Sequence, residues 1–132
     1  MRKYNLYYDD ASKTTFLIFE GFLNEQEFKN VWLEAVALIE AHQAPYFFID
    51  ASMERIIPTG AEEWLINEFA PLAEKHAQKL GYRLRAARVE SQDIFNRLAS
   101  EKSIKHFATS TQNFDFQNFP TKEEALKWLY QS

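Results

Sequence analysis

The chain has no cysteine among its 132 residues, which excludes disulfide bonds and thiolate metal sites and fits a reducing compartment. Its 3 glycines and 4 prolines are too few for long flexible linkers. The longest apolar runs, such as residues 16–19 and 46–49, are about four residues, whereas a transmembrane helix needs about 20. The amino terminus lacks the apolar core of a signal peptide. We therefore expect a soluble, cytoplasmic protein without an integral membrane segment.

Excess positive charge is also missing. The formal net charge is −4, so the chain as a whole does not match nucleic acid or an anionic membrane. Apolar residues make up 46% of the sequence and include 12 phenylalanines, enough to fill a core. A chain of this length usually forms one domain, and we expect residues 1–132 to be a single unit.

The first half of the chain predicts a hairpin followed by a helix and a strand. Residues 4–8 and 14–20 are the two arms, and the second arm is apolar on both faces, which places it inside the sheet. Asn24 and Glu27 predict a capped helix start. Residues 46–49 form a short, wholly apolar run, which is typical of a parallel strand covered on both faces.

The second half continues the alternation of helices and strands. Residues 59–80 are mainly helical, but Pro71 removes a hydrogen bond and predicts a kink or split near residues 69–71. The other expected elements are a strand at 82–89, a helix from Ser91 to about residue 106, an edge strand at 114–119 and a helix opening on Thr121. This order predicts a single α/β domain with a mixed, mostly parallel sheet of about five strands flanked by helices.

Three segments carry a family resemblance. They are FEGFLNEQEF after the hairpin, YFFID with the later helix start PTGAEEW, and the closing FPTKEEALKWL. In this order they resemble the STAS domain, the anti-sigma-factor-antagonist fold. The similarity is greatest to a branch of small stand-alone bacterial STAS-like proteins that also resemble CRAL-TRIO-type lipid-binding domains. Together the segments span nearly the whole chain.

The resemblance implies a regulatory position. In signalling STAS members the second helix opens with Asp-Ser-Ser-Gly, and a partner kinase phosphorylates the first serine. Aligned without a gap, that serine falls on Thr59, with Pro58, Gly60 and Ala61 at the other three positions. Thr59 is thus a candidate phosphoacceptor beside Gly60. The residues alone predict a plainer role, because Thr59 and Glu62 fit a capping box that would begin a helix.

The candidates for a partner or ligand surface are Asp50, Ser52, Gly60, Trp64 and Arg88. Asp50 and Ser52 follow the third strand, where they would either shape the loop or line a polar mouth with Thr59. Arg88, near the end of the fourth strand, could bind an anion, but we favour a pair with Asp50 or exposure to solvent. A partly exposed Trp64 would suit a partner surface or a small apolar pocket.

No catalytic or metal motif is evident. His42, His76 and His106 lack paired metal spacing, and the sequence contains no HExxH, glycine-rich phosphate loop or Ser-His-Asp order. We therefore expect no cofactor and a non-enzymatic, STAS-like regulatory or protein-interaction module whose partner binds around residues 50–64. The alternative is a small-molecule or lipid-binding domain with an apolar pocket under the second helix, and an enzyme ranks third. The oligomeric state stays open, a homodimer included.

Overall fold

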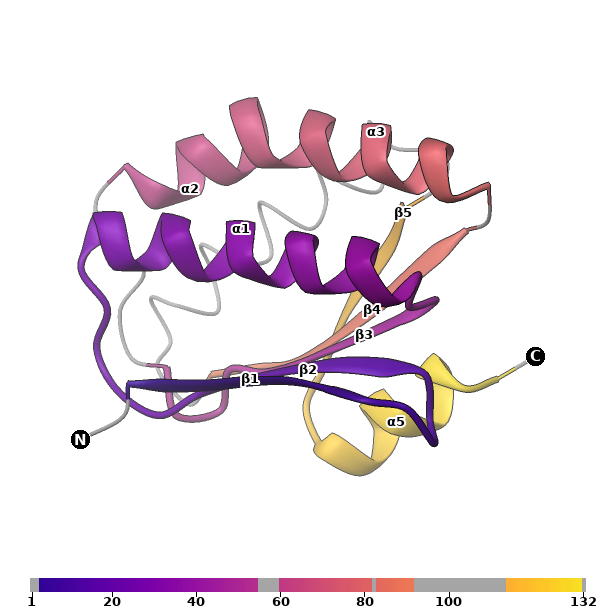
Figure 1. Ribbon diagram of the computed structural model, residues 1–132. Helices are drawn as coiled ribbons and strands as arrows, with labels where there is room; N and C mark the ends of the chain where they lie inside the picture. The colour runs from indigo at the N-terminus through magenta and orange to yellow at the C-terminus, as the bar shows by residue number, and fades with distance from the viewer. Residues whose placement is uncertain (1–2, 55–59, 82, 92–113, 132) are drawn as a thin grey trace.

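The computed structural model describes residues 3–54, 60–81, 83–91 and 114–131 (Figure 1). The elements in chain order are β1 (Tyr4–Asp9), β2 (Thr14–Phe19), α1 (Glu25–His42), β3 (Tyr46–Asp50), α2 (Ala61–Trp64), the π-helix η1 (Leu65–Phe69), α3 (Ala70–Leu80), β4 (Leu84–Val89), β5 (Phe114–Phe119) and α5 (Lys122–Leu129). The predicted α/β fold is confirmed. The helix expected from Ser91 to about residue 106 lies outside the described residues.

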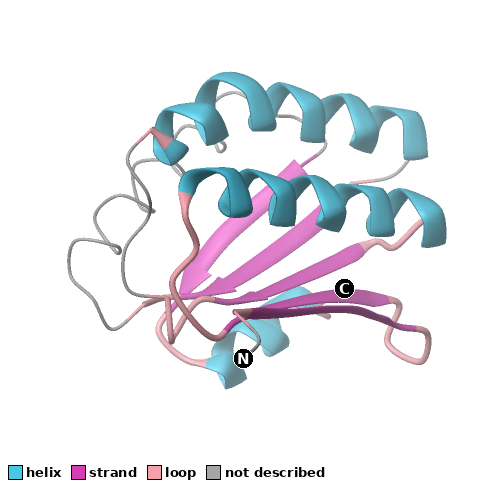
Figure 2. Cartoon of the chain, turned by 60° about the vertical axis from the view of Figure 1, so that its left-hand side comes forward, coloured by secondary structure: helices cyan, strands magenta, loops and turns pink. Residues whose placement is uncertain are grey.

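The five strands form one mixed sheet in the order β1-β2-β3-β4-β5. β1 is antiparallel to β2, and each later neighbouring pair is parallel. Figure 2 shows α1 and the α2–α3 segment side by side over one face, with α5 beneath the other. The predictions that the second hairpin arm lies inside the sheet and that residues 114–119 form an edge strand are both confirmed. Among the described residues no helix is long and apolar enough to cross a membrane.

Helix α1 begins as its sequence predicts. The Asn24 side chain accepts a hydrogen bond from the Glu27 backbone N–H at 2.8 Å, and the Glu27 carboxylate accepts one from the Asn24 backbone N–H at 3.0 Å. This reciprocal capping box satisfies donors that the first helical turn leaves free. That bond from Asn24, together with the ammonium of Lys3, holds the pKa of the Glu27 carboxyl below its usual value.

The long second helical segment changes its hydrogen-bonding pattern just before Pro71, in the region where an irregularity was predicted, but its helical path is not broken. Because proline has no backbone N–H, the regular i to i−4 ladder cannot continue through it. The chain accommodates the gap upstream through the wider turn of η1, in which the Ala70 N–H bonds to the Leu65 carbonyl. The helical path is kept, and α2, η1 and α3 together lie beside α1 (Figure 1).

Trp32 on α1 lies at the centre of the larger core cluster. Its ring meets Phe47 edge-on at a centroid distance of 6.0 Å and Phe69 at 5.2 Å. These contacts join α1, the sheet and η1 through edge-to-face aromatic packing. Residues with buried side chains on this face include Leu17, Phe28, Ala35, Ile49 and Phe116.

β3 is the central strand, and its apolar run is buried as predicted. Phe47 and Ile49 pack on the side of α1, whereas Phe48 joins Ala87 and Leu129 in a smaller cluster under α5. Successive side chains of a strand point to opposite faces. The same short run therefore supplies both cores, which explains why it is apolar at every position.

Substitution of Phe48 tests this central placement. Phe48→Ala should lower the free energy of unfolding by about 3–5 kcal/mol, because the ring is 1% exposed and its loss leaves a cavity under α5. Denaturant titration of the two proteins measures the difference. Leu33→Ala on the exposed face of α1 is the control and should cost far less. A loss below about 1 kcal/mol for Phe48→Ala would contradict the placement.

Candidate functional site

Polar and apolar candidate residues gather where β2, β3, β4 and β5 end. We call this end of the sheet, with the loops at residues 20–24 and 51–54 and the first turns of α1 and α2, the carboxyl-end edge. Because β2 and β3 are parallel and Ile18 is paired with Asp50, the loops that follow them leave the sheet side by side. Ligand and partner sites of open α/β sheets form at edges of this kind.

Asp50 and Ser52 shape the loop after β3. The Asp50 carboxylate accepts hydrogen bonds from the Ser52 backbone N–H at 3.0 Å and from its hydroxyl at 2.6 Å. The loop is also tied to the sheet, since the Ala51 N–H donates to the Val89 carbonyl at 3.1 Å. Of the two roles considered for this pair, the structure supports loop shaping, in which the aspartate carboxylate takes the place of a backbone carbonyl as the acceptor in a turn.

Arg88 is buried and paired, but not with Asp50. Its guanidinium is 2.8 Å from Oε1 of Glu54 and donates to the Asn118 side chain at 3.2 Å. Both preferred predictions, a pair with Asp50 and solvent exposure, are therefore wrong. The reason is strand alternation: Arg88 is in register with Ile49, so its side chain lies on the α1 side, whereas that of Asp50 lies on the α5 side.

Glu54, the partner of Arg88, is the residue of the candidate site that the sequence did not reveal. It lies four residues beyond the end of β3 and is only 6% exposed, although it is charged. The Ser91 hydroxyl donates to its backbone carbonyl, which ties the loop after β3 to the residues after β4. Glutamates are rarely buried unless paired, and the sequence offered only one signal. That signal was an acidic residue close to a strand end, opposite an arginine at the end of the next strand.

Gly60 places the start of α2 against α1. Its φ is 86°, a left-handed conformation that favours glycine, and its carbonyl accepts the first bond of α2 from the Trp64 N–H at 3.0 Å. A Cβ at this position would lie 3.1 Å from Oε1 of Glu25. The first turns of α1 and α2 therefore meet at the carboxyl-end edge. Thr59 lies outside the described residues, so its two predicted roles, cap and phosphoacceptor, stay predictions.

Trp64 is half-buried. Its ring packs against the main core and lies 5.6 Å from the ring of Phe69, centroid to centroid. The side chain is thus partly exposed, as a partner surface would require, but much of the ring stabilises the helix pair. We assign it to the border of the carboxyl-end edge.

Two exposed apolar side chains lie at the same edge. Met53, in the loop after β3, is 62% exposed, and Phe22, in the loop after β2, is 57% exposed. These are the highest values among the large apolar residues that the structure describes. Apolar exposure in neighbouring loops marks interaction surfaces more often than isolated surface residues do. Sequence reasoning missed both, because loop position and apolarity do not reveal exposure.

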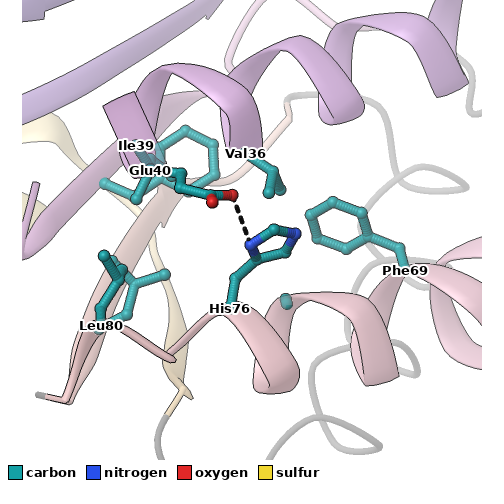
Figure 3. A pocket seen from close by; sticks show the side chains of 9 residues that line it. Val36, Ile39, Glu40, Phe69, His76 and Leu80 are labelled. Atoms are coloured by element: carbon teal, nitrogen blue, oxygen red, sulfur yellow. Dashed lines mark ion pairs between the residues drawn. The ribbon is translucent and has the colours of Figure 1, made fainter. Parts of the chain in front are cut away.

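A narrow apolar recess lies between α1 and α3 (Figure 3). Its volume is about 10 Å³, room for about one water molecule. At its mouth, Nδ1 of His76 on α3 is 2.7 Å from Oε2 of Glu40 on α1. The Lys79 ammonium, which donates to Glu40 at 2.8 Å, and the nearby His76 hold the pKa of the Glu40 carboxyl below its usual value. The recess is therefore part of the packing between α1 and α3, with the Glu40, His76 and Lys79 side chains beside it.

The histidines of the described chain serve packing and pairing. His42 stacks on the Tyr8 ring at a centroid distance of 4.1 Å, and His76 pairs with Glu40. His106 lies outside the described residues. Within the described part of the chain, no group of three or more His, Cys, Asp or Glu side chains is arranged to hold a metal ion.

Comparison of the chain with protein-family models, with curated proteins and with solved structures finds no match. The resemblance to the STAS domain therefore stays a hypothesis, carried by the order of the elements and the three sequence segments.

The buried pair gives a stability prediction. Arg88→Met should lower the free energy of unfolding by about 3–5 kcal/mol, because it removes the guanidinium that pairs with the buried Glu54 carboxylate. Arg88→Met combined with Glu54→Leu should recover most of that loss, since an apolar pair of similar volume needs no charge compensation. Denaturant titration of the wild type, of each single variant (Arg88→Met and Glu54→Leu) and of the double variant forms a double-mutant cycle.

An exposed ion pair is the control. Lys79→Met breaks the pair with Glu40, but Lys79 is 70% exposed, so its loss should cost at most about 1 kcal/mol. Equal effects of Arg88→Met and Lys79→Met would contradict a structural role for the buried pair.

Proposed function

We propose that this chain is a non-enzymatic, STAS-like regulatory or protein-interaction module whose partner docks on the carboxyl-end edge. The observation that supports it most is the exposure of Phe22 and Met53 in adjacent loops. Exposing large apolar side chains to water is unfavourable in the free protein, so burying them against a partner stabilises the complex and makes them natural anchors. The Arg88–Glu54 pair and the Asp50 turn hold the loop that carries Met53, which limits the entropy lost on binding.

The charges around these two side chains suggest the chemistry of the partner. Exposed carboxylates flank the anchors: Glu20 precedes Phe22, Glu25 begins α1, and Glu63 lies in α2. Lys29 partly compensates Glu25 at 3.1 Å. A partner segment with apolar side chains flanked by Lys or Arg would complement this surface and be steered toward it.

A protein partner is favoured over the small-molecule or lipid alternative. Ligand pockets are usually about 300–1,000 Å³, whereas the recess under the second helical segment has a volume of about 10 Å³. A lipid chain could enter there only if α1 and α3 separated. Their contact is held by the Glu40 pair with His76 and by apolar packing of Val36 and Phe69 (Figure 3).

Affinity capture tests the proposed docking surface. Wild-type protein and the double variant Phe22→Glu/Met53→Glu serve as bait in lysate of the native organism, and mass spectrometry identifies what each retains. The double variant should lose the partner, because it places charge at both anchors while leaving the fold intact. Leu33→Glu, on an exposed position of α1, is the matched control and should retain the partner. Identical capture by all three proteins would contradict docking at this edge.

Thr59 adds a regulatory proposal that rests on the STAS resemblance. A phosphate on Thr59 would precede Gly60 and the first turn of α2, where negative charge is favoured. It would also add charge to the proposed docking surface. Thr59→Glu should therefore weaken capture of the same partner, whereas Thr59→Ser should retain it, with circular dichroism as the check on folding. Equal capture by both variants would reduce Thr59 to a structural residue.

A further inference from the structure

Strand β1 leaves one edge of the sheet unpaired in the described part of the chain. The carbonyl of Lys3 accepts hydrogen bonds from the Glu20 N–H at 2.8 Å and from the Gly21 N–H at 3.0 Å, so the backbone of Lys3 bonds toward the β2 side. The direction of bonding alternates along an antiparallel strand, so every second residue bonds toward β2 and the others face outward. The outward backbone groups belong to Tyr4, Leu6 and Tyr8.

β1 lacks two features that often protect an edge strand, proline and a β-bulge. The strand contains no proline, and its register with β2 runs without a bulge from Tyr4 to Asp9. Proteins usually blunt free edges with such features. An open surface hollow of about 450 Å³ runs along the edge, lined by Lys3 to Leu6 of the chain and by Glu34 of α1.

We propose that two copies of the chain pair antiparallel through β1, with the two-fold axis at Leu6, so that their sheets become continuous. With this centre, Leu6 pairs with Leu6 of the second copy, and Tyr4 pairs with Tyr8 of the second copy. All three outward-facing residues then form hydrogen-bonded pairs. A centre at Asn5 or Tyr7 would pair only two of them within the strand, so Leu6 is the register with the most bonds.

The side chains of β1 are also self-complementary about Leu6. Aromatic rings meet in the two pairs of Tyr4 with Tyr8, which stabilise antiparallel ladders. Asn5 lies opposite Tyr7 of the second copy. At each end of the joined ladder Lys3 of one copy lies opposite Asp9 of the other, so like charges do not meet there, and the Lys3 ammonium itself pairs with Glu27.

The helix layer fits the same axis. Tyr4 donates to Oε2 of Glu34 at 2.9 Å, and the Tyr8 ring stacks on His42, so α1 runs along β1 in the same direction. A two-fold axis at Leu6 therefore brings Glu34 of one copy to the level of His42 of the other. Because α1 contacts both β1 and β2, it lies over the boundary between these strands. Its axis is then two strand spacings, about 10 Å, from the axis of α1 in the second copy, which is the normal distance for packed helices. Both helices then extend one continuous layer.

Sedimentation of the whole chain is the first test. Wild type should be a dimer at micromolar concentration. Leu6→Pro should raise the dimer dissociation constant by about tenfold or more, because each copy loses the N–H that it donates across the axis, so the dimer loses two hydrogen bonds. The bond toward β2 is unaffected, since an outward N–H makes none. Leu6→Ala loses the same side chain but keeps the N–H, so it is the matched control and should remain dimeric. A monomeric wild type, or a dimer indifferent to Leu6→Pro, would overturn the proposal.

Cross-linking tests the register independently of that variant. The chain has no cysteine, so one introduced thiol can react only with its copy. Two Leu6→Cys positions would face each other with Cα atoms about 5.5 Å apart, within disulfide reach. Two Tyr7→Cys positions would be diagonal and about 7–8 Å apart, although Tyr7 is more exposed. Rapid oxidation of Leu6→Cys but not of Tyr7→Cys is expected. The reverse order would exclude this register, as would equal rates.

Discussion

Two buried opposite charges, Arg88 and Glu54, hold the carboxyl-end edge together. Neither group would be stable there alone, because an unpaired charge in a protein interior costs several kcal/mol. Their pair joins the end of β4 to the loop after β3, and the Ser91 bond to the Glu54 carbonyl strengthens the same link. The Asp50 turn and the exposed Met53 lie within that loop. The shape of the proposed partner surface therefore depends on this buried contact together with the backbone bonds of the same loop.

The remainder of the fold supports this edge from both faces. Trp32 joins α1 to β3 and η1, while Phe48 anchors the layer of α5. The widened turn of η1 lets the helical path continue through Pro71 and keeps the start of α2 beside α1. Gly60 allows the close approach to Glu25 that this arrangement requires. Packing thus fixes where the loops begin, and the ion pair fixes how the loop after β3 lies.

Sequence reasoning reached the architecture because local patterns carry it. The Asn24 capping box, the apolar run at Phe47 and Phe48, and the irregular turn before Pro71 each follow from the chemistry of neighbouring residues. The partner and the exposure of Arg88 were predicted wrongly for a different reason. Its partner depends on the face of the sheet to which its side chain points. Arg88 points to the α1 side, where Glu54 lies, and a shift of one residue would turn it to the α5 side, where Asp50 lies. The exposure of Phe22 and Met53 likewise depends on the path of loops, which local propensity does not determine.

Amide hydrogen exchange measured by NMR is the most direct test of the role of this ion pair. In the wild type, the amide of Ala51, which bonds to Val89, and that of Glu54, which bonds to Ala51, should be protected nearly as well as strand amides. In Arg88→Met these two amides should exchange much faster, while Leu17 in β2 keeps its relative protection. Unchanged protection of Ala51 and Glu54 in the variant would contradict the claim that the buried pair holds the carboxyl-end edge in place.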